Sequence, residues 1–329
     1  MILRFLTSAI ALIIALLPAL GQERYGIVEL SSCYMREEPG YTKELGNQAL
    51  MGTIVTLGDK TGYWQQITSP EPYTAWVNDM AIVEKSAAEI SEYLAAPKYI
   101  VTGEISHLFV STSTASGRIC DLVACDLLRI CLDAKGRPIK KRGFVKAMLP
   151  SGRCGWVPKA DVTPFRDWAE KVKASQESII SAAEKFLGVP YLWGGNTTKG
   201  SDCSGLARCA YMSSGILLPR NSSQQIKIGD PVDVSGVFEG DFSALQPGDL
   251  VFFGNRQTGK PTHVAIYYGD GRIIHSSMLV RINSLRPSDP DYYSNGLPRL
   301  ITARRILGNV DCGKGIISLL RSPHYFPQE

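Results

Sequence analysis

The 329-residue chain has little net charge, because 35 Lys and Arg nearly balance 31 Asp and Glu to leave +4. So small an excess gives no basic surface of the kind that nucleic-acid-binding proteins use, and we expect no nucleic-acid partner. The eight cysteines include no C-x-x-C pair and no Cys–His spacing typical of zinc sites. The sequence therefore predicts no metal and no other cofactor.

Apolar runs long enough to cross a bilayer are missing after the first 21 residues. The N-terminal segment has a charged Arg4, a mostly apolar run from Phe5 to Leu17, and small residues at Ala19 and Gly21. This pattern predicts a secretory signal cleaved after Gly21; a retained membrane anchor is the alternative. We expect an exported protein of the periplasm or cell envelope, with no stable membrane insertion after cleavage.

The cysteines form no recognisable disulfide framework, although an exported chain with eight of them would ordinarily contain disulfides. Four could pair among themselves, and the sequence leaves their state open: Cys120, Cys125, Cys131 and Cys154.

Two blocks of short β-rich runs, residues 25–85 and 99–163, occupy the first half of the chain. Each shows four strand-like runs separated by turn residues, and the segment KSAAEISEYLAAP between them predicts a helical connector. The block endings YTAWVNDMAIV and CGWVPKADVTP resemble each other, which suggests a duplicated domain. Both blocks resemble bacterial SH3-like domains, small β-barrels often attached to cell-wall enzymes.

From about residue 166 the pattern changes to helices followed by strands. The segment KASQESIISAAEKFLGV predicts a helix that stops at Gly188 and Pro190, and a second helix is expected from Cys203 to about Ser214. One face of the first helix should carry Ile179, Ile180, Ala183, Phe186 and Leu187. The runs PGDLVFFG, HVAIYYG and RIIHSS predict three strands, which makes this an α+β domain.

Cys203, at the expected start of the second helix, is the candidate nucleophile. Asp202 is a good N-cap, and the helix N-terminus should lower the thiol pKa into the range of about 3.5–7.5. Cys209 lies about 120° around the helix and ~9 Å along it, so it belongs to another surface. The alternative for Cys203 is a buried, unreactive cysteine.

His263 and His275 flank the strand pair HVAIYYGDGRIIH, whereas His107 reads as a strand residue and His324 as a tail residue. A three-residue loop between the strands would make His263 and His275 diagonal neighbours, and a five-residue loop would set them opposite each other. A two-residue Asp-Gly loop would put them on opposite faces. On one face, they could serve Cys203 as base and orienting residue.

The segments PYLWGGNTTKGSDCSGLARCAY, LPRNSSQQ, LQPGDLVFF and THVAIYYGDGRIIHSS follow one another in this order. Together, over residues 175–305, they resemble the NlpC-type cell-wall cysteine peptidases, which have a papain-like fold. The resemblance implies Cys203 as nucleophile, His263 as general base and His275 as its orienting residue. It also implies that Tyr191 lies near the oxyanion site.

With two SH3-like domains in front, the chain resembles a subgroup, the γ-D-glutamyl-L-diamino-acid endopeptidases, also called dipeptidyl-peptidase VI. These cut L-Ala-γ-D-Glu from murein stem peptides, and their first SH3-like domain closes the cleft beyond the free L-Ala amine. The substrate-binding residues that this implies are Asp202, Ser204, Ser222, Arg220, Glu44 and Tyr73. Where the family often has Arg-Asp-Ser, this chain has Arg220-Asn221-Ser222.

We therefore expect an α+β fold: a papain-like NlpC-type catalytic domain preceded by two small SH3-like β-barrels. The expected bounds are 1–21 for the signal peptide, 22–86 and 87–165 for the barrels, 166–310 for the peptidase domain and 311–329 for a tail. The expected activity is hydrolysis of the γ-D-Glu–diamino acid bond by a monomer, with murein stem peptides or peptidoglycan as partners. The alternatives are an endopeptidase acting on intact peptidoglycan and a non-catalytic wall-binding protein.

Overall fold

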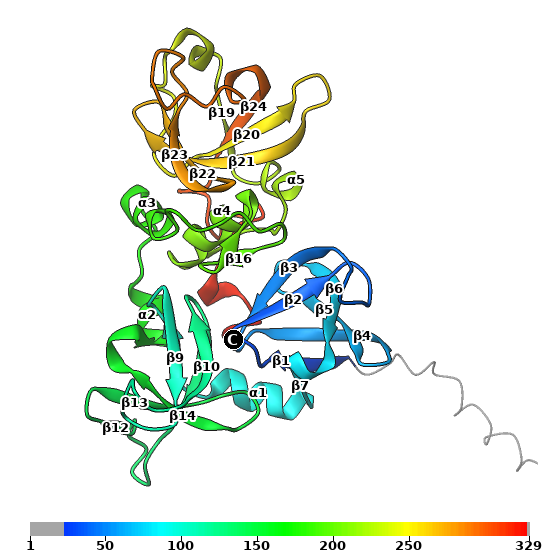
Figure 1. The fold of residues 1–329 in the computed structure, drawn as a ribbon, viewed down its shortest axis with the longest axis vertical. Helices are drawn as coiled ribbons and strands as arrows, with labels where there is room; N and C mark the ends of the chain where they lie inside the picture. The colour runs from blue at the N-terminus through cyan, green and yellow to red at the C-terminus, as the bar shows by residue number, and fades with distance from the viewer. Residues whose placement is uncertain (1–22, 328–329) are drawn as a thin grey trace, which may run out of the picture.

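Three sheet-containing units follow one another along the chain in the computed structural model, which describes residues 23–327 (Figure 1). The predicted signal segment, residues 1–21, lies outside the described residues. Within the described part of the chain, no helix combines the length and the apolar character that a membrane span requires.

The first unit is a seven-stranded antiparallel sheet with the order β3-β2-β6-β5-β4-β1-β7. Its strands are β1 Arg24–Val28, β2 Ser32–Arg36, β3 Leu45–Leu50, β4 Ile54–Thr61, β5 Trp64–Ser69, β6 Tyr73–Asn78 and β7 Ile82–Lys85. The expected four strands correspond to β1, β4, β5 and β6. Strand β3 escaped prediction because it buries the polar side chains of Asn47 and Gln48, which break the apolar pattern.

The second unit repeats this topology, with the order β10-β9-β14-β13-β11-β8-β15 and a short β12 beside β13. Its strands are β8 Lys98–Val101, β9 Ile105–Phe109, β10 Arg118–Val123, β11 Leu127–Ile130, β12 Lys140–Lys141, β13 Phe144–Met148, β14 Cys154–Pro158 and β15 Val162–Pro164. The similar sequence endings occupy equivalent places, β6–β7 and β14–β15, in agreement with the predicted duplication. The expected helical connector is α1, Ala87–Ala95, which begins with a capping box between Ser86 and Glu89.

The third unit is a six-stranded sheet, β19-β24-β20-β21-β22-β23, with helices packed on one face. Its helices are α2 Phe165–Lys171, α3 Gln176–Glu184, α4 Cys203–Met212 and α5 Ser222–Gln225. Its strands are β16 Asn196–Thr197, β17 Gly200–Ser201, β18 Ile216–Leu217, β19 Asp230–Val232, β20 Leu250–Asn255, β21 Lys260–Gly269, β22 Arg272–Ser277, β23 Leu279–Ser284, β24 Leu300–Arg305 and β25 Ile317–Ser318. The three predicted strands are β20, β21 and β22. Alternate residues of β20 and β21 enter two separate cores, so both sheet faces are covered.

The predicted apolar face of α3 is only partly confirmed. Ile179, Ala183 and Phe186 are buried, and Ile180 is half-buried against the same core. Leu187 is 46% exposed, because α3 ends at Glu184 and the helical periodicity no longer applies beyond that point.

Residues 311–327, expected to form a tail, instead pack against all three units. Strand β25 pairs with β18, and Tyr325 and Phe326 enter a core with Leu50 of the first unit and Phe165 of α2. The Phe326 and Phe165 rings stack with centroids 4.7 Å apart. The segment therefore joins parts of the molecule that are far apart in the sequence.

All eight cysteines are free in the structure, including Cys120, Cys125, Cys131 and Cys154. The sulfurs of Cys131 and Cys154 lie 3.6 Å apart without a covalent bond.

Candidate active site

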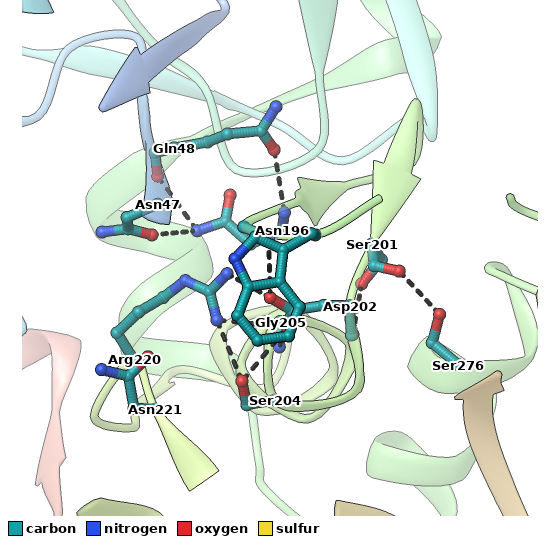
Figure 2. Close-up of polar contacts among 12 residues, drawn as sticks. Asn47, Gln48, Asn196, Ser201, Asp202, Ser204, Gly205, Arg220, Asn221 and Ser276 are labelled. Atoms are coloured by element: carbon teal, nitrogen blue, oxygen red, sulfur yellow. Dashed lines mark hydrogen bonds and ion pairs between the residues drawn. The ribbon is translucent and has the colours of Figure 1, made fainter. Parts of the chain in front are cut away.

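Cys203 is the first residue of α4, and Asp202 caps the helix as predicted. The Asp202 carboxylate accepts a hydrogen bond from the main-chain N–H of Gly205 at 2.7 Å. Arg220 also binds this carboxylate: its side chain is 1% exposed and donates to both Asp202 oxygens, at 2.6 and 3.2 Å (Figure 2). Ser204 Oγ and the N–H of Gly194 also donate to this carboxylate, at 3.1 and 3.0 Å.

The expected low pKa of the Cys203 thiol is wrong for this structure. Burial, with the neighbouring Asp202 carboxylate, raises the pKa of Cys203 to about 11. The main-chain N–H groups of Val264 and Ser204 lie against the thiol and lower its pKa, as does Arg220, but burial outweighs them. At neutral pH, the free protein therefore holds Cys203 as a thiol.

His263 lies on β21 and His275 on β22, and the structure brings their rings together. His263 Nε2 and His275 Nδ1 are 2.8 Å apart. The turn between the strands is the two-residue Asp270-Gly271, in which both φ angles are positive, at 48° and 70°.

The expectation that a two-residue turn would separate the histidines is wrong, because a β-bulge compensates for it. The register shifts between Tyr267 and Gly269, which leaves Tyr268 as an extra residue on β21. Beyond the bulge, Ile266 pairs with Ile274, so the register places His263 diagonally from His275 on the same face.

Burial keeps both histidines neutral. It lowers the pKa of His263 to about 3, with further contributions from His275 and Arg299. It lowers the pKa of His275 to about 4, with a further contribution from Arg281, although Asn283 acts in the opposite direction. The other side of the His275 ring, Nε2, lies 3.0 Å from Asn283 Oδ1 on β23.

The first unit docks beside the start of α4 through buried amides. Asn196 Nδ2 donates to Asn47 Oδ1 and to the carbonyl oxygen of Gln48, both at 3.0 Å (Figure 2). The main-chain N–H of Asn196 donates to Gln48 Oε1 at 2.8 Å. This docking brings β3, and with it Glu44, against the loop that precedes the candidate nucleophile.

Both predicted residues of the first unit lie at this junction. Glu44 accepts a hydrogen bond from Trp193 Nε1 at 2.7 Å. The Tyr73 hydroxyl donates to Glu37, an acid that the sequence analysis missed. Arg220 lowers the pKa of Tyr73 and Glu44 raises it, although burial is the largest cause of its raised pKa, so Tyr73 lies within electrostatic reach of both.

Tyr191 is half-buried beside the thiol: burial, Cys203 and Asp202 all raise its pKa. Ser222 lies in the first turn of α5, two residues after Arg220. His107 lies on β9 and His324 in the C-terminal segment. Neither takes part in the His263–His275 contact or the His275–Asn283 contact.

Three further residues around the site were missed: Glu37, Asn283 and Tyr293. The Tyr293 ring packs 4.6 Å from the His275 ring and 6.0 Å from the His263 ring, centroid to centroid. Recognition of β23 could have revealed Asn283, since β22 and β23 pair Ile273 with Asn283 and so put Asn283 diagonal to His275. No signal in the sequence identifies Glu37 or Tyr293.

The NlpC/P60 family matches residues 188–297 of the chain. Over 271 residues the chain is 35% identical to dipeptidyl-peptidase 6 of Lysinibacillus sphaericus, covering 81% of this chain and 93% of that one. It is 29% identical over 261 residues to gamma-D-glutamyl-L-lysine dipeptidyl-peptidase of Bacillus cereus, covering 76% and 72%.

The fold is similar to that of a solved NlpC/P60 family protein from Bacillus cereus ATCC 10987. The TM-score is 0.70 at 24% identity, and the likeness covers 85% of this chain and 99% of that one. Since the relative from Lysinibacillus sphaericus is matched over almost its whole length, the chain belongs to the NlpC/P60 family.

Proposed function

We propose that this protein is a cysteine peptidase that hydrolyses the γ-D-Glu–diamino acid bond of murein stem peptides with a free N-terminal L-Ala. The observation that carries the proposal is the junction at the start of α4. There, Cys203 lies against the main-chain N–H of Val264, the residue that follows His263, and His263 is hydrogen-bonded to His275. The docked first unit adds Glu37, Glu44 and Tyr73. The name of the Bacillus cereus relative, gamma-D-glutamyl-L-lysine dipeptidyl-peptidase, supports this bond, and the name of the Lysinibacillus sphaericus relative, dipeptidyl-peptidase 6, supports release of a dipeptide.

Catalysis begins with a neutral thiol and a neutral imidazole. As Cys203 Sγ attacks the γ-carbonyl carbon of D-Glu, its proton passes to His263 Nδ1, the ring nitrogen that His275 does not engage. The Val264 and Ser204 N–H groups stabilise the sulfur as it becomes negative. The carbonyl oxygen gains charge near the Tyr191 hydroxyl and the start of α4.

The C–N bond then breaks, and His263 returns its proton to the departing amine of the diamino acid. This leaves L-Ala-γ-D-Glu bound to Cys203 as a thioester. A water molecule, deprotonated by His263, attacks the thioester and releases the dipeptide and the thiol.

The L-Ala ammonium is recognised by the docked first unit. Charge-assisted hydrogen bonds to a carboxylate are the strong ones, and Glu37, Glu44 and the Tyr73 hydroxyl supply acceptors there. Asp202 already accepts five hydrogen bonds, from Gly205, Ser204, Gly194 and both Arg220 nitrogens. Its role is therefore to hold Arg220 and the α4 terminus beside Ser204, and Ser222 contacts the peptide from α5.

The same proposal includes the domain organisation. The first two units are SH3-like domains, within residues 22–86 and 87–165, and the peptidase domain spans residues 166–310. Residues 1–21 are a signal peptide that directs the protein out of the cytoplasm, to the periplasm or cell envelope.

The test compares L-Ala-γ-D-Glu-diamino acid with its N-acetylated form at equal concentration, with products identified by mass spectrometry. Glu37 and Glu44 are exposed in the free protein, so the bound substrate must desolvate this contact. Loss of one partner of a contact desolvated in this way costs about 2–5 kcal/mol, so acetylation should lower kcat/KM about 30- to 5,000-fold. Cys203→Ala is the control that should release no dipeptide. Comparable kcat/KM values for the two substrates would contradict the closed cleft and favour an endopeptidase acting on intact peptidoglycan.

A further inference from the structure

We propose that Asn283 is a positioning residue that fixes the tautomers of both histidines and so selects His263 Nδ1 as the base. The proposal rests on the proposed function for its kinetic part only. Its structural basis is a row of three side chains on neighbouring strands: His263 on β21, His275 on β22 and Asn283 on β23.

The orientation of the Asn283 amide is set by a main-chain carbonyl. Asn283 Nδ2 lies 2.7 Å from the carbonyl oxygen of Asp291, which can only accept a hydrogen bond. That carbonyl also accepts from the Ser284 N–H, and the Asp291 side chain pairs with Arg272 at 2.6 Å. Because Asp291 is held in this way, Asn283 must turn Oδ1, its acceptor, toward His275.

The Asn283 acceptor determines the tautomer of His275. Since Oδ1 cannot donate, His275 Nε2 must carry the proton that joins them across 3.0 Å. A neutral imidazole has one N–H, and His275 is neutral, so its Nδ1 is left as an acceptor.

The tautomer of His275 in turn determines the tautomer of His263. The acceptor Nδ1 of His275 lies 2.8 Å from His263 Nε2, which must therefore donate. His263 is also neutral, so its lone pair is on Nδ1, the nitrogen that remains for the thiol proton. In the reversed arrangement, His275 would donate to His263, and His263 Nδ1 would carry a hydrogen and could not act as a base.

The charged groups near the two histidines cannot accept a hydrogen bond from His275 in place of Asn283. Arg299 approaches His263, and Arg281 approaches His275; both disfavour an imidazolium, but neither can accept a hydrogen bond. Tyr293 presents its ring to His275. Among the contacts described for His275 Nε2, Asn283 is the acceptor.

The test measures the tautomers in the free protein by two-bond ¹H–¹⁵N correlation NMR with ¹⁵N-labelled histidine. His107→Gln and His324→Gln variants assign the two remaining histidines without altering the site. The wild-type protein should show His263 and His275 both protonated at Nε2. A wild-type spectrum with His263 protonated at Nδ1 would overturn the proposal.

Two variants of Asn283 separate positioning from simple support of the fold. Asn283→Leu removes the acceptor at similar size, and His275 and His263 should then show a mixture of tautomers. We expect kcat to fall about 10- to 100-fold, the size of the effect when a metal-ligating histidine loses its orienting partner. Asn283→Asp keeps an acceptor and should keep both tautomers and most of kcat. Its carboxylate should also raise the pKa of His275 and move the acidic limb of kcat/KM to higher pH.

Asn255→Leu is the matched control. Asn255 also makes two side-chain hydrogen bonds, to the N–H groups of Gln257 and Thr258, but in the turn after β20. It should keep wild-type tautomers and kcat. Wild-type tautomers or wild-type kcat in Asn283→Leu would refute the positioning role, whereas failure of the wild-type enzyme to cleave a stem peptide would refute the proposed function alone.

Discussion

At the residue scale, His275 is buried and His263 is half-buried, both as neutral rings, and we expect this to make the fold sensitive to acid. In the unfolded chain, a histidine binds a proton near pH 6.5. In the folded protein, His263 does so only near pH 3 and His275 near pH 4. Their contribution to stability is therefore complete above about pH 6.5 and is lost as the pH falls toward 4 and 3.

We predict that the free energy of unfolding, measured with urea, falls between pH 7 and pH 4, and that His263→Gln/His275→Gln reduces this fall. His107→Gln, at a half-buried position of β9, should keep most of the wild-type acid dependence. An equally steep fall in the double variant would show that other groups cause the acid sensitivity.

Local sequence signals were sufficient to predict that Asp202 caps a helix starting at Cys203 and that His263 and His275 lie on adjacent strands, because helix caps and strand-forming runs are local properties. The thiol pKa was mispredicted because burial depends on packing by the sheet and the loops. Glu37 was missed because its position beside Tyr73 depends on how β2, β3 and β6 are arranged.

At the element scale, the sequence predicted the histidine strands but not how they achieve the correct register. The Asp270-Gly271 turn by itself would put His263 and His275 on opposite faces, and the bulge at Tyr268 corrects this. A bulge has no reliable sequence signal, since Tyr268 looks like any other strand residue. The sequence could therefore give only alternatives for whether His263 and His275 lie on the same face of the sheet.

The loop before α4 passes so close to β3 that it requires a glycine at residue 194. Gly194 has φ +76°, and an added Cβ would lie 2.4 Å from the carbonyl oxygen of Leu45. Gly136 has φ +74° with no neighbour within 4 Å of an added Cβ. An alanine there would have the same left-handed backbone strain as at residue 194 but no close contact with another strand.

We predict that Gly136→Ala lowers the free energy of unfolding by about 1–2 kcal/mol, the cost of a left-handed alanine, and leaves kcat/KM unchanged. Gly194→Ala should cost more and should also lower kcat/KM for the free-amine substrate, because it displaces Trp193 from Glu44. Urea unfolding and steady-state kinetics measure both effects. Equal effects of the two variants would mean that the loop does not need its close contact with β3.

At the scale of the whole molecule, the three units share buried interfaces rather than resting against one another. The core that contains Tyr325 and Phe326 includes residues of both N-terminal sheets and of the third unit. A second link is the ion pair between Glu71 of the first unit and Arg208 of α4, at 2.9 Å, with both side chains at most 4% exposed. Asn47 Nδ2 also donates to Glu71, at 3.1 Å.

This ion pair allows the docking of the first unit to be tested directly. Glu71→Ala leaves Arg208 buried without its counter-charge, which should cost about 3–5 kcal/mol of stability in urea unfolding. Glu84→Ala breaks the exposed Arg24–Glu84 pair of the same unit and should cost no more than about 1 kcal/mol.

Glu71 links the first unit to α4 through Arg208, so its loss should also loosen the docking of the first unit, which we propose excludes N-acetylated substrate. We predict that Glu71→Ala lowers the ratio of kcat/KM for the free-amine substrate to kcat/KM for the N-acetylated substrate, whereas Glu84→Ala keeps the wild-type ratio. A large loss of stability in Glu71→Ala with an unchanged ratio would mean that the preference for a free amine does not depend on how firmly the first unit is docked. The preference would then have to come from Glu37, Glu44 and Tyr73 acting locally, which single substitutions of these residues can measure.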